Sequence, residues 1–237
     1  MNKLFNHLHN EFGKSQNIAQ LNDEIRLKNV LDKVEALLLN REIHSIKTVL
    51  YIIKIYTDRY VSNRSANLLE ADNIPYNKPN PILFSVMQNY ETKDIFKIHL
   101  GKVPILTNPF DSKKLRIAIQ KYGDPYCSWK YNKDGHLFGL FAPLGITAIT
   151  DNGNHSVTAG LIKSQGTLYA SKENIYDISY CYEKYIYRDG WFWKVQQCQN
   201  QALSPCYEAP FDFAVLFEIG RLLIKHRINL VEYFPRV

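Results

Sequence analysis

Apolar residues recur at three- and four-residue spacing near the start of the chain, with charged residues between them. This period predicts an amphipathic helix that begins near Ile18, followed by a second helix from about His44 to Val61. The apolar positions of the first helix are Leu21, Ile25, Leu27, Val30, Leu31, Val34, Leu37 and Leu38. Prolines and asparagines then break the pattern between Asn63 and Pro81. We therefore expect an N-terminal helical region over residues 1–80 and a main domain over residues 81–237.

The main domain begins with short apolar runs that alternate with helical patterns. We expect a strand over Ile98–Leu106, and then a helix over Ser112–Tyr122 that Ser112 caps and Gly123 ends. Two further apolar segments occupy Leu137–Ile149 and bend at Pro143.

The second half of this domain repeats the alternation. A helix over Asn154–Ser164, closed by Gly166, is followed by a strand over Thr167–Ala170. Asp189-Gly190 predicts a hairpin between two aromatic strands, Tyr180–Arg188 and Trp191–Gln197, and the last helix covers Phe211–His226. Together these elements predict a mixed α+β fold.

Composition narrows the function classes. The chain has 237 residues, of which 46% are hydrophobic, which is enough for one sizeable core. A formal net charge of +6 suits a polyanionic partner such as nucleic acid, but a basic solvated surface explains it equally well.

Charged residues interrupt every long apolar run, so we expect no membrane span. The four cysteines, Cys127, Cys181, Cys198 and Cys206, have no zinc-like spacing, which favours reduced thiols in a cytoplasmic protein.

The strongest candidate for chemistry is the turn at Asp151–Ser156, which lies between the apolar run Gly145–Thr150 and a helix start. The first amides of a helix have no intrahelical partner and favour an anion such as phosphate. His155 lies within this turn and could contact phosphate or act as a general acid or base. It could equally stabilise the turn as a cap. Asn154, Ser156 and Thr158 are candidates to bind the phosphate, and each also suits a first helical turn.

Asp134 and His136 form a second polar cluster. They could bring a carboxylate and an imidazole to the same rim as catalytic groups, although a hairpin turn with Asp-Gly at its tip explains them more simply. If His136 and His155 converge, Asp134 or Asp151 could complete a divalent metal site with them.

Several of these segments together resemble the ParB and sulfiredoxin-like domains. The resemblance rests on Val103-Pro-Ile, Asn108-Pro-Phe, Lys121-Tyr-Gly, Pro143-Leu-Gly-Ile and Asp151-Asn-Gly-Asn-His-Ser, over roughly Leu100 to Ala170. In that superfamily a DGNHR-type turn and the following helix bind nucleotide phosphates. The resemblance therefore implies that Gly153, Asn154 and His155 form a phosphate-binding turn, with a nucleotide and magnesium as the ligands to test.

Two positions differ from the family pattern. Asn152 is inserted before Gly153, and Ser156 stands where an arginine is usual. Four basic residues on the predicted helices Ser112–Tyr122 and Asn154–Ser164 are candidates to replace that arginine. They are Lys113, Lys114, Arg116 and Lys163.

Two function classes follow. One is an enzyme that acts on a phosphoester or nucleotide, a nuclease or a nucleotide-dependent enzyme, in which His155 transfers a proton or contacts the phosphate. The other is a non-catalytic module that binds nucleic acid or a protein. A bacterial plasmid, phage or defence setting, where ParB-like domains occur, would suit either class. In both, the N-terminal helices could form a homodimer or contact a protein partner.

Overall fold

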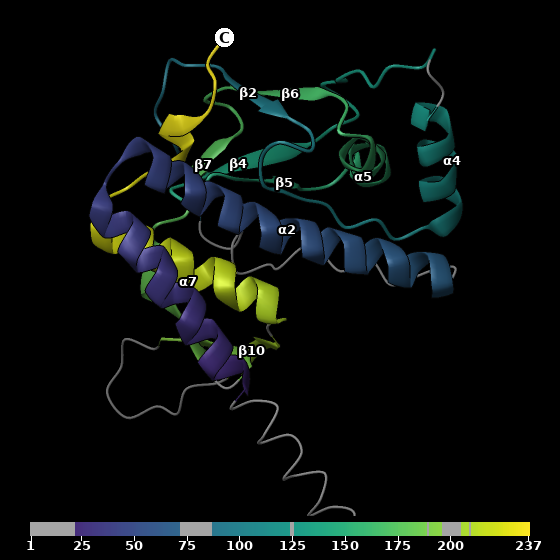
Figure 1. The fold of residues 1–237 in the computed structure, drawn as a ribbon. Coiled ribbons are helices and arrows are strands. Elements are labelled where there is room, and N and C mark those ends of the chain that lie inside the picture. Colours follow the sequence, from purple (N-terminus) through teal and green to yellow (C-terminus); the bar gives the residue numbers. More distant parts are fainter. Residues whose placement is uncertain (1–21, 72–86, 124–125, 189, 196–204, 209) are drawn as a thin grey trace, which may run out of the picture.

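The computed structural model describes residues 22–71, 87–123, 126–188, 190–195, 205–208 and 210–237 (Figure 1). It has the mixed α+β fold that the sequence predicts. A helix over residues 22–40 leads into the long helix α2 (Ile43–Ala71). The predicted start of the first helix, at Ile18, lies outside the described residues.

A five-stranded mixed sheet forms the centre of the molecule, in the strand order β1-β7-β4-β5-β3. Two of its strand pairs are parallel, β3 with β5 and β4 with β7, and the other two pairs are antiparallel. The strands are β1 (Gln88–Asn89), β3 (Ile105–Leu106), β4 (Phe138–Ala142), β5 (Ile146–Ile149) and β7 (Ile175–Asp177).

Two smaller antiparallel sheets accompany the central one. One pairs β2 with β6, and the other has the order β10-β9-β8. Their strands are β2 (Phe96–His99), β6 (Thr167–Ala170), β8 (Tyr185–Arg188), β9 (Trp191–Lys194) and β10 (Pro205–Glu208). The remaining helices are α4 (Ser112–Gly123), α5 (Asn154–Lys163), α6 (Cys181–Lys184), α7 (Phe211–His226) and a 3-10 turn, η1 (Leu230–Tyr233).

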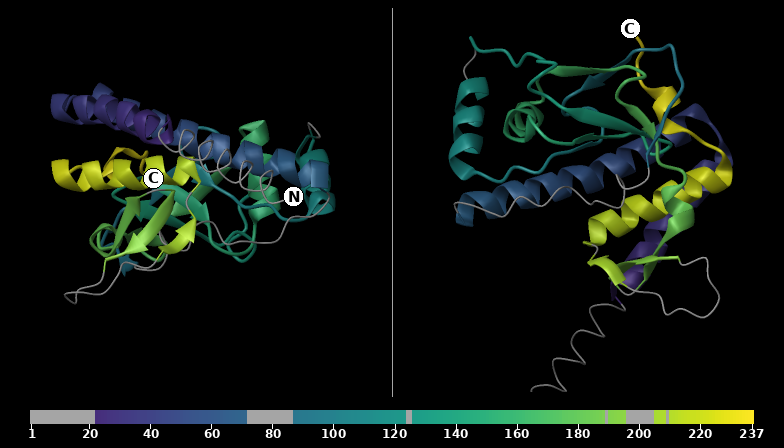
Figure 2. Two further views of the ribbon diagram at one scale, coloured as in Figure 1. Left: turned by 90° about the horizontal axis from the view of Figure 1, so that it is seen from below. Right: turned by 180° about the vertical axis from the view of Figure 1, so that it is seen from behind.

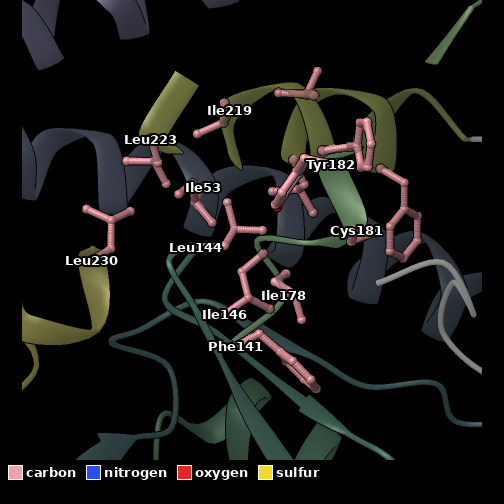
Figure 3. Packing of buried hydrophobic residues seen from close by; sticks show 14 of the residues in the cluster. Ile53, Phe141, Leu144, Ile146, Ile178, Cys181, Tyr182, Ile219, Leu223 and Leu230 are labelled. Carbon is pink, nitrogen blue, oxygen red and sulfur yellow. The ribbon is translucent and has the colours of Figure 1, made fainter. Parts of the chain in front are cut away.

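The two faces of the central sheet bury separate clusters of apolar side chains. On one face the sheet packs against α2, α7 and the helix over residues 22–40. Figure 3 shows Ile53 of α2 and Leu223 of α7 near Leu144 and Ile146, which lie at the turn into β5. On the other face β2, β6 and α5 cover Ile105, Leu140 and Ile149. The two regions predicted from the sequence thus share one core, because Val34 and Ile53 lie in the same cluster as α7.

Several element boundaries differ from the predictions. The segment Ile98–Leu106 is two strands in different sheets, because the chain turns at Gly101, which has φ 79°. Helix α2 continues ten residues beyond Val61, since Ser65 and Leu68 keep the buried three- and four-residue spacing of its earlier turns. The break predicted from Asn63 onward is therefore wrong as far as Ala71, and the prolines that follow lie outside the described residues.

Other boundaries are confirmed. Helix α7 has the predicted ends, α4 begins at Ser112, and the hairpin β8–β9 turns at Gly190. The first half of Tyr180–Arg188 is the short helix α6 rather than strand. Helix α5 ends at a left-handed Ser164, with φ 51°, two residues before the predicted Gly166.

Candidate functional site

The turn at Asp151–Ser156 lies at one edge of the central sheet, beside the loop Thr107–Asp111. Because β3 and β5 are parallel neighbours, the segments that follow them leave the sheet at the same edge. The segment after β3 leads into α4, and the segment after β5 leads into α5. These two helices pack against each other (Figure 1). We call the segment Gly153–Ser156 the GNHS turn.

Asn154 and Thr158 fasten α5 to this loop. The Asn154 side-chain oxygen accepts the Asn108 amide at 2.7 Å, and its side-chain nitrogen donates to the Asp151 carbonyl at 2.8 Å. The Thr158 hydroxyl donates a hydrogen bond to the Asn154 carbonyl oxygen at 2.6 Å. It therefore accepts a hydrogen bond from the Thr107 hydroxyl, whose oxygen lies 2.7 Å away. Both side chains are buried, and their polar atoms contact the protein itself.

His155 accepts hydrogen bonds from the loop that leads into α4. Its Nε2 lies 3.3 Å from the Phe110 amide nitrogen and 3.1 Å from that of Asp111. The neutral ring therefore carries its proton on Nδ1. The imidazole also packs edge-on against the Phe110 ring, with centroids 4.8 Å apart. Burial lowers the pKa of His155 below its ordinary value, which agrees with an acceptor Nε2. These contacts join α5 to the loop before α4 rather than capping the turn that contains His155.

His136 holds the GNHS turn from its other side. Its Nδ1 accepts the Asn132 amide at 2.9 Å, which places the proton of the neutral ring on Nε2. That proton points to the Ser156 hydroxyl at 3.0 Å, and Ser156 donates in turn to the Gly153 carbonyl at 3.1 Å. The ring is buried in a stack with Trp129, with centroids 4.7 Å apart, and burial lowers its pKa.

Gly153 requires its hydrogen side chain. Its φ is 102°, and a Cβ at this position would lie 2.9 Å from His136 Cδ2 and 3.0 Å from the Gly135 carbonyl oxygen. The indole nitrogen of Trp129 donates to the Ser156 carbonyl at 2.9 Å. The irregular segment before β4 that carries Trp129 and His136 therefore lies directly against the turn.

Other predicted site residues do not join this cluster. Asp134 is exposed in the turn before His136, where its amide donates to the Asn132 side chain. Lys163 is the last residue of α5, about 14 Å along the helix axis from Asn154 at about 1.5 Å per residue. Lys163 therefore lies at the opposite end of α5 from the GNHS turn, and its replacement of the missing arginine stays a prediction. Lys114 is nearer, since its ammonium lies 5.7 Å from the centroid of the Phe110 ring that packs on His155.

The amino-terminal ends of α4 and α5 differ in how they are capped. Asp111 caps α4 through a hydrogen bond from the Lys114 amide at 2.9 Å, which lowers the pKa of this carboxyl group. The cap is Asp111 rather than the predicted Ser112. Helix α5 begins after Gly153, and no side chain of a described residue caps it. Its first intrahelical bond runs from the Val157 amide to the Gly153 carbonyl at 2.8 Å.

Sequence reasoning did not single out Asn108 as a candidate site residue. This residue is fully buried, and among the described residues neither polar atom of its side chain has a hydrogen-bond partner. An unpaired buried amide is costly, and water or a ligand satisfies it in most proteins. Its sequence context, Asn-Pro, signals a turn and gave no sign of burial.

The described residues contain no group of three or more His, Cys, Asp and Glu side chains that could hold a metal ion. The metal site predicted from convergence of His136 and His155 with Asp134 or Asp151 therefore does not form among these residues. Cys127 is a free thiol, and burial raises the pKa of Cys181 to about 12. Within the described part of the chain, no helix has the length and apolar character needed to cross a membrane.

Comparison with known sequences places nearly the whole chain in one group. Searches of curated proteins and of solved structures returned no match. Residues 7–230 match the profile of a family of unknown function. The chain therefore belongs to that family, DUF6710.

Proposed function

We propose that this protein binds a phosphate group of a nucleotide or nucleic acid at the amino-terminal end of α5, within a core of the ParB and sulfiredoxin-like type. The observation that carries the proposal is the uncapped start of α5 at Gly153. A helix end of this kind presents backbone amides and a partial positive charge to an anion. The neighbouring helix α4 is already capped by the carboxylate of Asp111, so α5 is the better anion site of the two.

Binding has more support than proton transfer. A general base must have a free lone pair within reach of the substrate proton. The Nε2 of His155 already accepts two backbone amides, and the Nδ1 of His136 accepts another. Phosphoester chemistry by these two histidines would require both rings to leave their present partners. We therefore favour the non-catalytic binding module over the enzyme.

The contacts between distant motifs support the ParB-like core. Asn108-Pro-Phe and the GNHS turn lie about 45 residues apart in the chain, and two sets of hydrogen bonds join them. The order β3, α4, β4, β5, α5, β6 also agrees with the order of segments on which the resemblance rests. Lys113 and Lys114 are exposed at the start of α4 and would add attraction for an anion beside Phe110.

The test is calorimetric titration of the protein with ATP, CTP and GTP, each with and without magnesium, and with a single-stranded oligonucleotide. Asn152→Asp adds a negative charge at an exposed position just before Gly153 with almost no change of shape. We expect this variant to bind about two- to fivefold more weakly, as for a charge at a helix end.

Asn67→Asp is the matched control, because Asn67 is also exposed but lies on α2. It should bind as the wild type does. If none of the ligands binds, or if both substitutions weaken binding equally, the anion site at α5 is wrong.

A further inference from the structure

Helix α2 carries a ridge of large exposed side chains. Ile43, Lys47, Tyr51 and Ile55 follow one another at four-residue spacing, and all four are exposed. The exposed fractions of the three apolar side chains are 65% for Ile43, 63% for Tyr51 and 61% for Ile55. Side chains at this spacing form a continuous ridge on a helix surface. We call these four residues the α2 ridge.

The α2 ridge lies on the outer side of the helix. Ile46, Val49 and Ile53 fill the inner side, where they join the core with α7 and the central sheet. Figures 1 and 2 show α2 at the outside of the molecule, with the sheet and α7 on one side of it. The exposed side chains on the other side are therefore not needed for the core of this chain.

The order of residues in the α2 ridge is complementary to itself under a two-fold rotation. An axis that passes between Lys47 and Tyr51 places Ile43 against Ile55 of a second copy and Lys47 against the Tyr51 ring of that copy. The first contact buries apolar surface, and the second is a cation–π pair. Each contact occurs twice, as in the isologous interface of a cyclic dimer.

The packing rules for helices allow this arrangement. When ridges at four-residue spacing interdigitate, two helices cross at about −50° and their ridges run alongside each other. All four residues of the ridge can then contact the second copy, although the helix axes diverge. We propose that the α2 ridge is the interface of a homodimer, with the two α2 helices crossing near Lys47 and Tyr51. This interface is independent of the phosphate site at α5.

The register can be tested by charge exchange. Tyr51→Lys places a lysine against Lys47 of the second copy, and this repulsion should raise the dimer dissociation constant at least about tenfold. The double variant Lys47→Glu with Tyr51→Lys restores an attractive pair across the axis, so it should recover most of the loss. Analytical ultracentrifugation of the full chain over a range of concentrations measures each dissociation constant.

Ile117→Lys on α4 is the control, because Ile117 is 55% exposed and lies outside the α2 ridge. It should leave dimerisation unchanged, and circular dichroism should show that all variants keep their helices. A wild type that stays monomeric at every concentration would overturn the proposal. A dimer that Tyr51→Lys leaves intact, or a double variant no tighter than Tyr51→Lys, would also overturn it.

Discussion

The side chains around the GNHS turn act mainly as cross-links between segments. Asn154 and His155 bind amides of the loop before α4, and Ser156 binds His136. These contacts leave the backbone amides at the start of α5 as the group best suited to a ligand. At this scale the polar residues position the site, and the main chain would bind the anion.

His155→Ala should lower the free energy of unfolding by about 1–3 kcal/mol, because two backbone amides lose their acceptor. Urea unfolding measures the change. His44→Ala is the control, since His44 is exposed on α2, and it should change stability by less than about 0.5 kcal/mol. Equal stability of the two variants would contradict this role of His155 as acceptor for the two loop amides.

Stability should depend on pH through His136. Because burial lowers the pKa of this histidine in the folded protein, the unfolded chain binds its proton more readily. The stabilisation is fully present above the unfolded pKa of about 6.5 and is lost as pH falls through the folded pKa. His136→Gln keeps an acceptor and a donor without a titrating group. Its urea unfolding between pH 7.5 and 5.5 should lose less stability than the wild type, and parallel losses would contradict the assignment.

At the scale of elements, α7 is tied to α6 by close packing and by an arginine. Arg221 donates to the carbonyls of Tyr182 and Tyr185 at 3.1 and 3.0 Å. Tyr182 packs against Gly220, where an added Cβ would overlap its hydroxyl group. That hydroxyl is buried, and among the described residues it has no hydrogen-bond partner. Burial raises the pKa of Tyr182 well above its ordinary value.

Tyr182→Phe should therefore raise the free energy of unfolding, by about 1 kcal/mol, because it removes an unsatisfied buried group. Gly220→Ala should lower it by about 1–2 kcal/mol, since overpacking outweighs the gain in helix propensity. When Tyr182→Phe is already present, Gly220→Ala should lower the free energy of unfolding by at least about 0.5 kcal/mol less than it does alone. Urea unfolding of the three variants measures these values, and a destabilising Tyr182→Phe would contradict the account.

The sequence predicted elements best where local signals and tertiary packing agree. Helix α7 has a clear apolar period and its predicted ends, because the side it buries is long and continuous. The extension of α2 to Ala71 was missed because its serines and asparagines have weak helix propensity, although the alanines and leucines between them favour a helix and Leu68 packs in the core. Strand β7 was missed because three residues carry too little periodicity.

The candidate site was predictable in place but not in detail. A polar turn between an apolar strand and a helix is a local signal, so the GNHS turn could be found from the sequence. The partners of its side chains could not, because Asn108 and Asp111 approach it from more than 40 residues away. The burial of Asn108 also depends on this long-range packing.

At the scale of the whole molecule, the N-terminal helices are part of the core. Val34, Leu38 and Ile53 lie in one cluster with residues of α7. Arg59 of α2 forms an ion pair with Asp212 of α7, and Glu35 accepts a hydrogen bond from Lys225 at 2.6 Å. The helices over residues 22–71 should therefore unfold together with the rest of the chain.

Urea unfolding followed by two signals tests this expectation. Far-ultraviolet circular dichroism reports all helices, whereas fluorescence reports Trp129, Trp191 and Trp193, which all follow residue 87. We expect one transition with the same midpoint by both signals, as in two-state unfolding. A separate loss of helix before the change in fluorescence would show that the N-terminal helices are an independent unit.

The most direct test of phosphate binding at α5 is a nuclear magnetic resonance titration of the full, nitrogen-15-labelled chain with whichever of the three nucleotides and the oligonucleotide binds most tightly. The account predicts that the largest shifts occur at the amides of Gly153, Asn154, His155 and Ser156, with smaller changes at Lys113 and Lys114. Shifts confined to other parts of the molecule, or no shifts with any of these ligands, would contradict the central claim.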